Sequence, residues 1–411
     1  MPITESSRPG ATTMPWRALV ALASAVFLSI TIEMLPTGLL PEMSAELGVG
    51  APLVGLLVSV FAFAVVVSSA PLTALLRRVP RRTLMTVVLV VLGLTTAASA
   101  LVPEYWMLVS VRVAGGVAHG LFWALVGAYP ARLVGEAHLG RAVSVVLGGG
   151  TIALIAGVPL ATALGQALGW RWAFGVVALL TLAGAVLVRL VLPADGATRA
   201  VSTATGSVVA TGAVPAVGRT SMRAVLAVCV VTAIVMIGQY AALTYVAPLL
   251  TDVVGVSPAA VAPLLFASGL AGAAGLMVAG SAIARDSARA LVVAMTLLAV
   301  ALVAIAAEPG LWAGIIAYTA WGFAFGAIPP LLQTRLLQAA PPERRDAASA
   351  FYTTAFNVGI GGGALVGSLL YGAFGVGSVP VAYAALLVVA MVVVVASARA
   401  ARARAAVAAG A

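Results

Sequence analysis

Residues 16–40 have the sequence WRALVALASAVFLSITIEMLPTGLL. A bilayer core about 30 Å thick is crossed by roughly 20 apolar residues in a helix, and this stretch exceeds that length. Eleven further stretches qualify in the same way: 52–76, 83–102, 105–130, 141–165, 170–192, 223–247, 258–283, 288–307, 311–334, 347–373 and 378–398. The sequence therefore predicts an all-α membrane protein with twelve transmembrane helices.

Composition supports this fold class and excludes several kinds of structural and binding site. The chain is 63% hydrophobic and 8% charged, whereas soluble domains carry about 25% charged residues. One Cys and two His rule out a disulfide framework and an ordinary four-ligand zinc site. The absence of Lys rules out the lysine-containing phosphate-binding loop of ATPases. We therefore expect no metal and no cofactor.

The chain divides into two similar halves. One long connection, rich in Ala, Gly, Ser and Thr, separates six helices from six. The expected domains are a tail (1–15), a six-helix bundle (16–192), a linker (193–222), a second six-helix bundle (223–398) and a basic tail (399–411). Such pseudo-symmetric halves place a substrate site between them, near the middle of the membrane. A central cavity between two bundles is therefore predicted.

The arginines predict the orientation. The formal charge is +10, and with alternating spans twenty arginines fall on one side while Arg171 alone falls on the other. The positive-inside rule then places both termini and the linker in the cytoplasm. The arginines form no folded basic face, so nucleic acid is not an expected partner. We expect a multi-pass, monomeric protein of a bacterial inner membrane.

Several motifs resemble one family. Glu33 to Pro41 resembles the first helix of the drug/proton antiporter branch of the major facilitator superfamily, which includes chloramphenicol exporters and arabinose/sugar efflux-like proteins. Further similar segments are Ala70-Pro71-Leu72 with Arg77 to Arg82, Arg112 with Gly115-Gly116 and His119-Gly120, and Gly157-Val158-Pro159. The chain departs from the superfamily loop motif, because Arg77 and Pro80 stand where the motif has Asp and Gly. The resemblance implies transport by alternating access.

Glu33 is the acidic residue that lies deep within an apolar run. An ionisable group in the hydrocarbon layer costs about 2.5–3.5 kcal/mol on insertion scales, which indicates a functional role. Glu33 and Arg112 both lie seven residues from the outer ends of their helices, so they share a depth of roughly 10 Å. Burial favours a neutral carboxyl group, whereas a nearby guanidinium favours a charged one. We predict a proton-coupling pair; the alternative is a permanent ion pair joining the two helices.

His119 lies seven residues after Arg112, on the same helix face. An imidazole can exchange a proton near neutral pH, so His119 is a candidate proton relay. The alternative is a neutral histidine that lines the pocket and hydrogen-bonds to a hydroxyl group. The predicted proton-coupling residues are therefore Glu33, Arg112 and His119.

Candidate substrate-binding residues fall into two chemical classes. Neutral hydrogen-bonding side chains and flat apolar side chains are offered by Gln239, Tyr240, Tyr245, Asn357, Phe122, Trp123, Trp321 and Phe325. For the aromatic residues, core packing or lipid contact is the alternative.

Candidate gating residues lie in a basic loop and at helix-breaking positions. They are Arg77, Arg78, Arg81, Arg82, Gly157, Pro159, Pro329 and Pro330. Pro329 and Pro330 lack backbone donors, so we expect them to interrupt their helix. For Gly157, close helix packing is the alternative role.

These features favour a proton-coupled antiporter that exports a small, mostly apolar compound, such as a phenicol antibiotic. One buried acid and one buried arginine do not suit a strongly anionic substrate. Sugar, nucleoside or other metabolite efflux is the alternative. An intramembrane enzyme is not expected, since the chain has no His-Glu-x-x-His motif and no buried acid pair.

Overall fold

The structure is a computed structural model that describes residues 14–127, 129–193, 221–280, 286–308, 310–341 and 344–409. Within these ranges the chain is helical and has no strand. Twelve helices are long and apolar enough to span a membrane, which confirms the predicted fold class. The N-terminal segment 1–13 and the linker segment 194–220 lie outside the described ranges.

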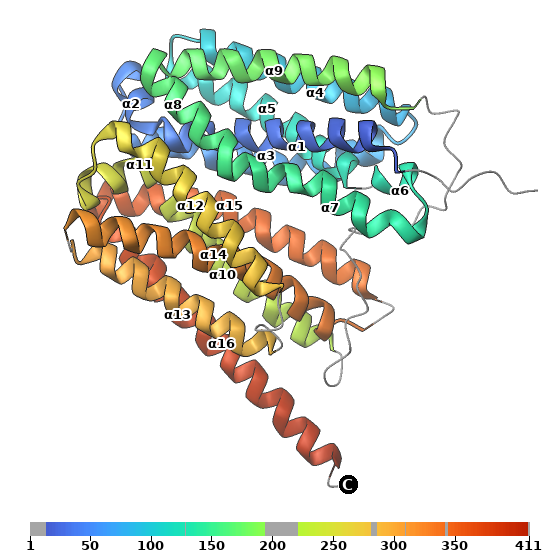
Figure 1. The fold of residues 1–411 in the computed structure, drawn as a ribbon, viewed down its shortest axis with the longest axis vertical. Coiled ribbons are helices and arrows are strands. Elements are labelled where there is room, and N and C mark those ends of the chain that lie inside the picture. Colours follow the sequence, from blue (N-terminus) through green and yellow to red (C-terminus); the bar gives the residue numbers. More distant parts are fainter. Residues whose placement is uncertain are drawn as a thin grey trace, which may run out of the picture.

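Two bundles divide these helices, as Figure 1 shows. The N-terminal bundle contains α1 (Trp16–Gly38), α2 (Leu40–Leu47), α3 (Ala51–Leu75), α4 (Arg81–Leu101), α5 (Tyr105–Val126), α6 (Pro130–Leu133), α7 (Glu136–Ile152), the π-helical turn η1 (Ala153–Gly157), α8 (Val158–Leu168) and α9 (Trp170–Val191). The C-terminal bundle contains α10 (Met222–Thr244), α11 (Val246–Pro248), η2 (Leu249–Val254), α12 (Pro258–Ala279), α13 (Ser287–Ala306), α14 (Leu311–Ala339), α15 (Arg345–Phe374) and α16 (Ser378–Ala409).

The two bundles repeat one another with a constant offset along the chain. Helices α1, α4 and α5 begin at Trp16, Arg81 and Tyr105, and helices α10, α13 and α14 begin at Met222, Ser287 and Leu311. The separation between the starting residues is the same for all three pairs. Residues at equal distances from the starts of paired helices are therefore counterparts in the two halves.

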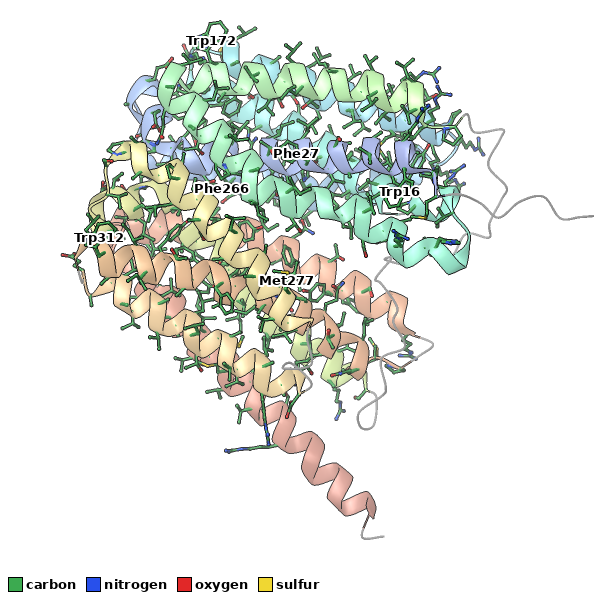
Figure 2. All side chains as sticks on the ribbon, viewed as in Figure 1. Trp16, Phe27, Trp172, Phe266, Met277 and Trp312 are labelled. Carbon is green, nitrogen blue, oxygen red and sulfur yellow. The ribbon has the colours of Figure 1, made fainter. Side chains whose placement is uncertain are left out.

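The outer surface is apolar and carries tryptophan at both ends (Figure 2). Exposed side chains such as Phe266 and Met277 project from the helices. Trp16 lies at one end of the molecule, and Trp172 and Trp312 lie at the other. Because Trp concentrates at membrane–water interfaces, these residues mark the two edges of the embedded region.

The two ends of the molecule differ in charge. We name them by the helix termini they hold: the arginine-rich end includes Arg17, Arg81, Arg189 and Arg223, and the arginine-poor end includes Glu42, Glu46, Arg171 and Asp252. Helix α16 continues past the bundle at the arginine-rich end (Figure 1). The side chains of Arg402 and Arg404 in this extension lie outside what the structure describes.

Hydrogen bonds join the bundles at the arginine-poor end. The hydroxyl groups of Tyr245 and Ser368 both donate to the carbonyl oxygen of Pro52, at 3.2 and 3.0 Å. Gln166 Nε2 donates to the carbonyl oxygen of Pro258 at 2.9 Å. Toward the arginine-rich end the two bundles diverge (Figure 1). The molecule is therefore closed at the arginine-poor end.

Midway along the bundles, small residues allow close approach. A Cβ added at Gly269 of α12 would lie 2.7 Å from the Cα of Ile155 in η1. Val58 and Ala62 of α3 pack against Ile360 and Ala364 of α15. The two bundles therefore pack directly against each other at this depth.

Helix α14 continues through Pro329 and Pro330, so the expected interruption is wrong. The two prolines leave the carbonyl groups of Phe325 and Gly326 without their helical donors. Flanking turns remain helical because α14 packs closely on α12: a Cβ at Gly326 would overlap the backbone of Gly272. Tertiary packing overrides the local effect of the prolines.

This close packing yields a stability prediction. Gly326→Val should destabilise the protein by about 1–3 kcal/mol, because an overpacked interface must shift. Gly148→Val is the matched control, since an added Cβ there meets no neighbour within 4 Å. Thermal unfolding in detergent measures both variants. Equal losses of stability would contradict the close packing of α12 on α14.

Glu42 yields a second prediction, at the arginine-poor end. Burial raises the pKa of the Glu42 carboxyl, while bonds from its own backbone N–H and from Gln166 lower it, and Oε2 is buried without a hydrogen-bond partner. Its stabilising contribution is therefore largest below the pKa of free Glu, about 4.3, and is lost as pH rises through the raised value.

Glu42→Gln removes this titration, so its unfolding temperature should vary less with pH between about 4.5 and 7 than that of the parent. Exposed Glu104→Gln serves as the control and should retain the parent's variation. An unchanged pH dependence in Glu42→Gln would count against the buried carboxyl.

Candidate proton and substrate site

Arg112 joins α5 to α1 through the backbone of α1. Its Nη1 donates to the carbonyl oxygen of Ile32 at 3.1 Å, and its Nη2 donates to that of Glu33 at 3.2 Å. In a helix the Ile32 carbonyl would accept from residue 36, but Pro36 has no N–H group. Arg112 therefore satisfies the carbonyl group that Pro36 leaves free.

The Glu33 carboxylate lies beside His119 rather than on the guanidinium group. Glu33 is 8% exposed, and its Oε2 is 3.5 Å from His119 Nε2. Among the described residues, no direct ion pair joins this carboxylate to Arg112. Longer electrostatic interactions connect it to Arg112 and to Tyr240 of α10. The carboxylate can thus change charge without breaking the bond between α1 and α5.

His119 is held by hydrogen bonds on both ring nitrogens. Trp123 Nε1 donates to Nε2 at 2.8 Å, and Nδ1 lies 2.9 Å from Ser29 Oγ. An indole N–H can only donate, so Nε2 must accept, and Nδ1 carries the proton of the neutral ring. The network therefore assigns His119 to the neutral Nδ1–H tautomer.

Phe61 of α3 contacts both Arg112 and His119. We use the name Glu33 cluster for Glu33, Arg112, His119 and their neighbours Ser29, Phe61 and Trp123. Its ring meets the imidazole of His119 edge to face, with centroids 5.0 Å apart. The guanidinium carbon of Arg112 lies 4.1 Å from the centroid of the same ring. A cation over an aromatic face is attracted by the ring quadrupole. Phe61 thus stabilises Arg112 and lies against His119 as well.

The C-terminal half has a neutral counterpart of Glu33. Gln239 occupies the position in α10 that Glu33 occupies in α1. Its Oε1 accepts from Trp321 Nε1 at 2.8 Å and from Tyr383 Oη at 3.1 Å. Gln239, Trp321 and Tyr383 are all buried. The carboxyl group at this position therefore belongs to the N-terminal bundle, and its C-terminal counterpart is a neutral amide.

The eight candidate substrate-binding residues divide into two groups by burial. Buried in the bundles, with exposures of 4% or less, are Phe122, Gln239, Tyr245 and Trp321. Partly exposed are Trp123, Tyr240, Phe325 and Asn357. In this conformation only the second group is accessible from outside the bundles.

Two of the accessible residues have further contacts. Tyr240 packs against the cluster of Val58, Ala62, Ile360 and Ala364, so it borders both bundles. Asn357 Nδ2 donates to the carbonyl of Thr353 within its own helix. Tyr240 is thus a partly exposed C-terminal residue at the boundary between the bundles, within electrostatic range of Glu33.

The predicted gating residues lie in two places. Arg77 and Arg78 are exposed between α3 and α4, and Arg81 is half-buried. Arg82 Nε donates to the carbonyl of Arg189 at 2.9 Å, which connects α4 to α9 within one bundle.

Gly157 and Pro159 lie where the π-helical turn η1 meets α8. A Cβ at Gly157 would overlap Thr31 Oγ1 of α1. Pro159 removes a helical donor at this point, and π-helical turns often occur at functional positions. These two residues therefore combine close packing with an irregular helix beside the bundle interface.

Two members of the cluster, Ser29 and Phe61, were missed from the sequence. Ser29 lies four residues before Glu33, so helical periodicity places both on one face. That spacing was a usable signal. Phe61 lies on a different helix, and nothing in its local sequence distinguishes it from other apolar residues of α3.

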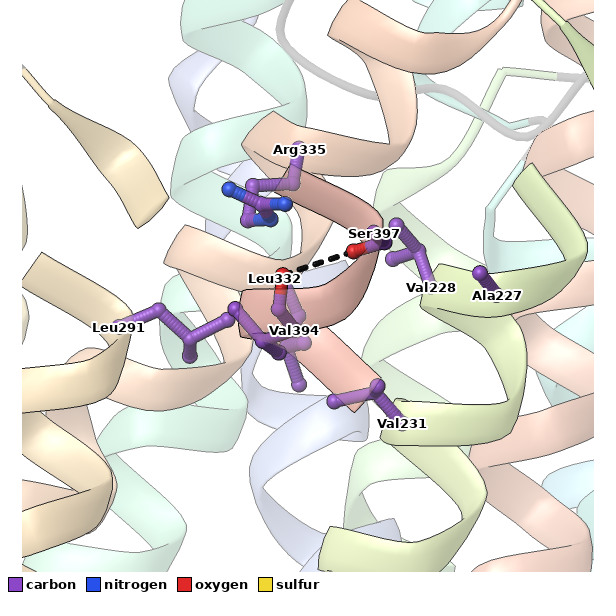
Figure 3. Close-up of a pocket in the computed structure, with 8 residues that line it drawn as sticks. All are labelled: Ala227, Val228, Val231, Leu291, Leu332, Arg335, Val394 and Ser397. Carbon is purple, nitrogen blue, oxygen red and sulfur yellow. Dashed lines mark hydrogen bonds between the residues drawn. The ribbon is translucent and has the colours of Figure 1, made fainter. Parts of the chain in front are cut away.

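A small cavity lies elsewhere, among helices of the C-terminal bundle (Figure 3). Its lining is Ala227, Val228, Val231, Leu291, Leu332, Arg335, Val394 and Ser397. Ser397 Oγ donates to the carbonyl of Val394 in its own helix. These residues belong to α10, α13, α14 and α16, so the cavity is separate from the Glu33 cluster.

Comparison with known proteins identifies relatives over most of the chain. The family model described as Major Facilitator Superfamily matches residues 22–290 and 228–410. A chloramphenicol efflux pump of Mycobacterium tuberculosis is 33% identical over 377 residues, covering 88% of each chain. A probable sugar efflux transporter of Helicobacter pylori is 28% identical over 361 residues, covering 88% of this chain and 90% of the relative.

Solved structures share the fold. A bacterial homologue of the human lysosomal transporter Spinster, in an inward-facing and unoccupied conformation, superimposes with a TM-score of 0.74 at 16% identity, covering 95% of this chain and 98% of that one. The human organic anion transporter MFSD10 gives a TM-score of 0.66 at 17% identity, covering 93% and 100%.

The contact between Arg112 and Pro36 can be tested by a double-mutant cycle. Arg112→Met should destabilise the protein by about 1–3 kcal/mol, because two buried carbonyl groups lose a charged donor. Pro36→Ala supplies an N–H group for the Ile32 carbonyl, so Arg112→Met should cost less in that background. Unfolding in detergent would give a coupling of about 0.5–3 kcal/mol. Additive effects would show that the two residues do not share this carbonyl.

Proposed function

The chain belongs to the major facilitator superfamily, and we propose that it is a proton-coupled antiporter that exports a small, mostly apolar compound by alternating access. It is a multi-pass membrane transport protein rather than an enzyme. The single observation that carries the proposal is the Glu33 carboxyl group, which is buried between helices yet free of a direct ion pair with arginine among the described residues.

This environment suits a group that gains and loses a proton. Within the membrane, ionisable side chains face the protein interior and mark proton or substrate pathways. Arg112 is held on two backbone carbonyls, so its position does not depend on the charge of Glu33. Protonation of Glu33 can therefore change the local charge while the helix packing persists. The proton gradient supplies the energy, and the cycle requires no cofactor.

In the proposed cycle, substrate and proton compete for the region around Glu33. Substrate loads at the arginine-rich end as Glu33 loses its proton there. We assign this end to the cytoplasm together with both termini and the linker. After the bundles rock, protonation from outside favours release. Return of the protonated carrier and loss of the proton inside restore the loading state. One polypeptide contains both bundles, so a monomer suffices for this cycle.

The accessible side chains favour an apolar, weakly polar substrate. Trp123 and Phe325 offer flat apolar surfaces, while Tyr240 and Asn357 offer neutral hydrogen-bonding groups. The relative named as a chloramphenicol efflux pump supports a phenicol-like compound.

Sugar or other metabolite efflux is the second candidate, because another relative is named a probable sugar efflux transporter. A sugar requires many hydrogen bonds, but Gln239 already accepts two and Asn357 already donates to its own helix. Accumulation of labelled chloramphenicol or arabinose in inverted membrane vesicles would distinguish the two candidates. Arabinose accumulation without chloramphenicol accumulation would favour the second.

Glu33→Gln should abolish chloramphenicol export driven by a pH gradient while retaining binding, because an amide cannot exchange a proton in this pH range. Uptake into inverted vesicles with an imposed pH gradient measures export, and a protonophore defines the uncoupled rate. Exposed Glu104→Gln is the control and should transport at the parent rate. Export by Glu33→Gln at the parent rate under the same gradient would overturn the coupling role.

A further inference from the structure

One nitrogen atom of His119 has two neighbours that compete for it. The Nε2 lone pair accepts from Trp123 Nε1 at 2.8 Å, while Glu33 Oε2 lies 3.5 Å away. A ring nitrogen accepts a single hydrogen bond along its lone pair. As long as the indole N–H occupies this position, the imidazole cannot take a proton from the Glu33 carboxyl group.

We propose that Trp123 is a positioning residue that keeps His119 in its neutral Nδ1–H tautomer, and that substrate releases His119 for proton transfer by displacing the Trp123 indole. The inference rests on the proposed proton-coupled function and adds to it the residue that links substrate to proton. The family resemblance assigns no role to this tryptophan.

Exposure makes Trp123 the accessible member of the cluster. His119 is 2% exposed and Glu33 is 8% exposed, whereas Trp123 is partly exposed. Trp123 also lies three residues before the end of α5 at Val126, toward the arginine-rich end where the bundles diverge. A flat apolar compound entering from that end therefore reaches the indole before it reaches the imidazole.

The proton transfer itself is simple and balanced. The O–H bond of protonated Glu33 breaks, an N–H bond forms at His119 Nε2, and a carboxylate and an imidazolium result. Ser29 Oγ keeps accepting from Nδ1–H, which stabilises the imidazolium at its second ring nitrogen. No oxidant, reductant or further reactant is needed.

The surrounding charges are few. On α5 itself Arg112 is the nearby cation, and it is held on the carbonyls of α1. From α3 the neighbour is the uncharged ring of Phe61, and from α10 it is the phenol of Tyr240. Glu33 of α1 is the carboxyl group beside the ring. The transfer is therefore governed by Glu33, Trp123 and Ser29.

The tautomer can be observed directly, because the chain has two histidines. In a His138→Gln background, ¹⁵N-histidine NMR reports His119 alone. The parent should show the Nδ1–H pattern at pH 7, and Trp123→Phe, which keeps a ring but has no donor, should shift toward Nε2–H. Trp172→Phe, an exposed tryptophan of α9, should leave the pattern unchanged. An Nε2–H parent, or an unchanged pattern in Trp123→Phe, would overturn the proposal.

Coupling can be tested in liposomes with an internal pH dye, a pH gradient and chloramphenicol as the probe. Trp123→Phe should leak protons without chloramphenicol, about fivefold to tenfold faster than the parent, since losing one hydrogen bond changes an equilibrium by about that factor. Glu33→Gln added to Trp123→Phe should abolish the leak.

These results separate the two proposals. Parent-level export by Glu33→Gln defeats the proton-coupled function itself. Loss of export in Glu33→Gln, together with a Trp123→Phe variant that stays tightly coupled, defeats only the role of Trp123. The NMR measurement of the His119 tautomer does not depend on transport. It therefore tests the role of Trp123 whether or not Glu33→Gln exports chloramphenicol.

Discussion

The site depends on one interaction, the donation of two hydrogen bonds from Arg112 to the carbonyl groups of Ile32 and Glu33. Pro36 creates the need for it by removing the donor that the Ile32 carbonyl would have in a regular helix. Because the guanidinium binds backbone, α1 and α5 stay joined whatever the charge on Glu33. A direct ion pair would behave differently, since protonating its carboxylate would leave a buried arginine unpaired at a cost of several kcal/mol. The observed arrangement makes the packing of α1 on α5 independent of a direct bond to the Glu33 carboxylate.

The repeated halves place different chemistry on equivalent positions. Glu33 and Gln239 lie at the same place in α1 and α10, yet one is ionisable and the other accepts two neutral hydrogen bonds. The same comparison pairs Tyr318 with Arg112 and Phe325 with His119. The scaffold is thus duplicated and the ionisable cluster is not. Neutral residues at these C-terminal positions can face substrates of varied shape without the desolvation penalty that a buried charge there would bring.

The fold could be predicted from the sequence because the membrane demands about 20 apolar residues per span, and that length is visible in the chain. Helical periodicity and shared depth also placed Glu33, Arg112 and His119 together. They could not indicate which atoms Arg112 would bind, although Pro36 was a usable signal for a free carbonyl. The rotation of each helix was not predictable either: Phe122 and Trp321 are buried whereas Trp123 is partly exposed. In a membrane both the lipid-facing and the protein-facing sides are apolar, so hydropathy does not distinguish them. Pro329 and Pro330 suggested a break, but the contacts of α14 with α12 keep the helix continuous.

At the closed end the described residues join the bundles through apolar packing and neutral hydrogen bonds, without an ion pair between the bundles. Three neutral hydrogen bonds to the carbonyls of Pro52 and Pro258 join the bundles there, and each contributes about 1 kcal/mol because water can replace it when the end opens. Two conformations must differ by only a few kcal/mol if a ligand is to shift the balance between them. One proton moving down a gradient of one pH unit supplies about 1.4 kcal/mol, which is comparable to one of these hydrogen bonds. The energy of one proton is therefore similar to that of one hydrogen bond in this seam, whereas separating a buried ion pair there would cost several kcal/mol.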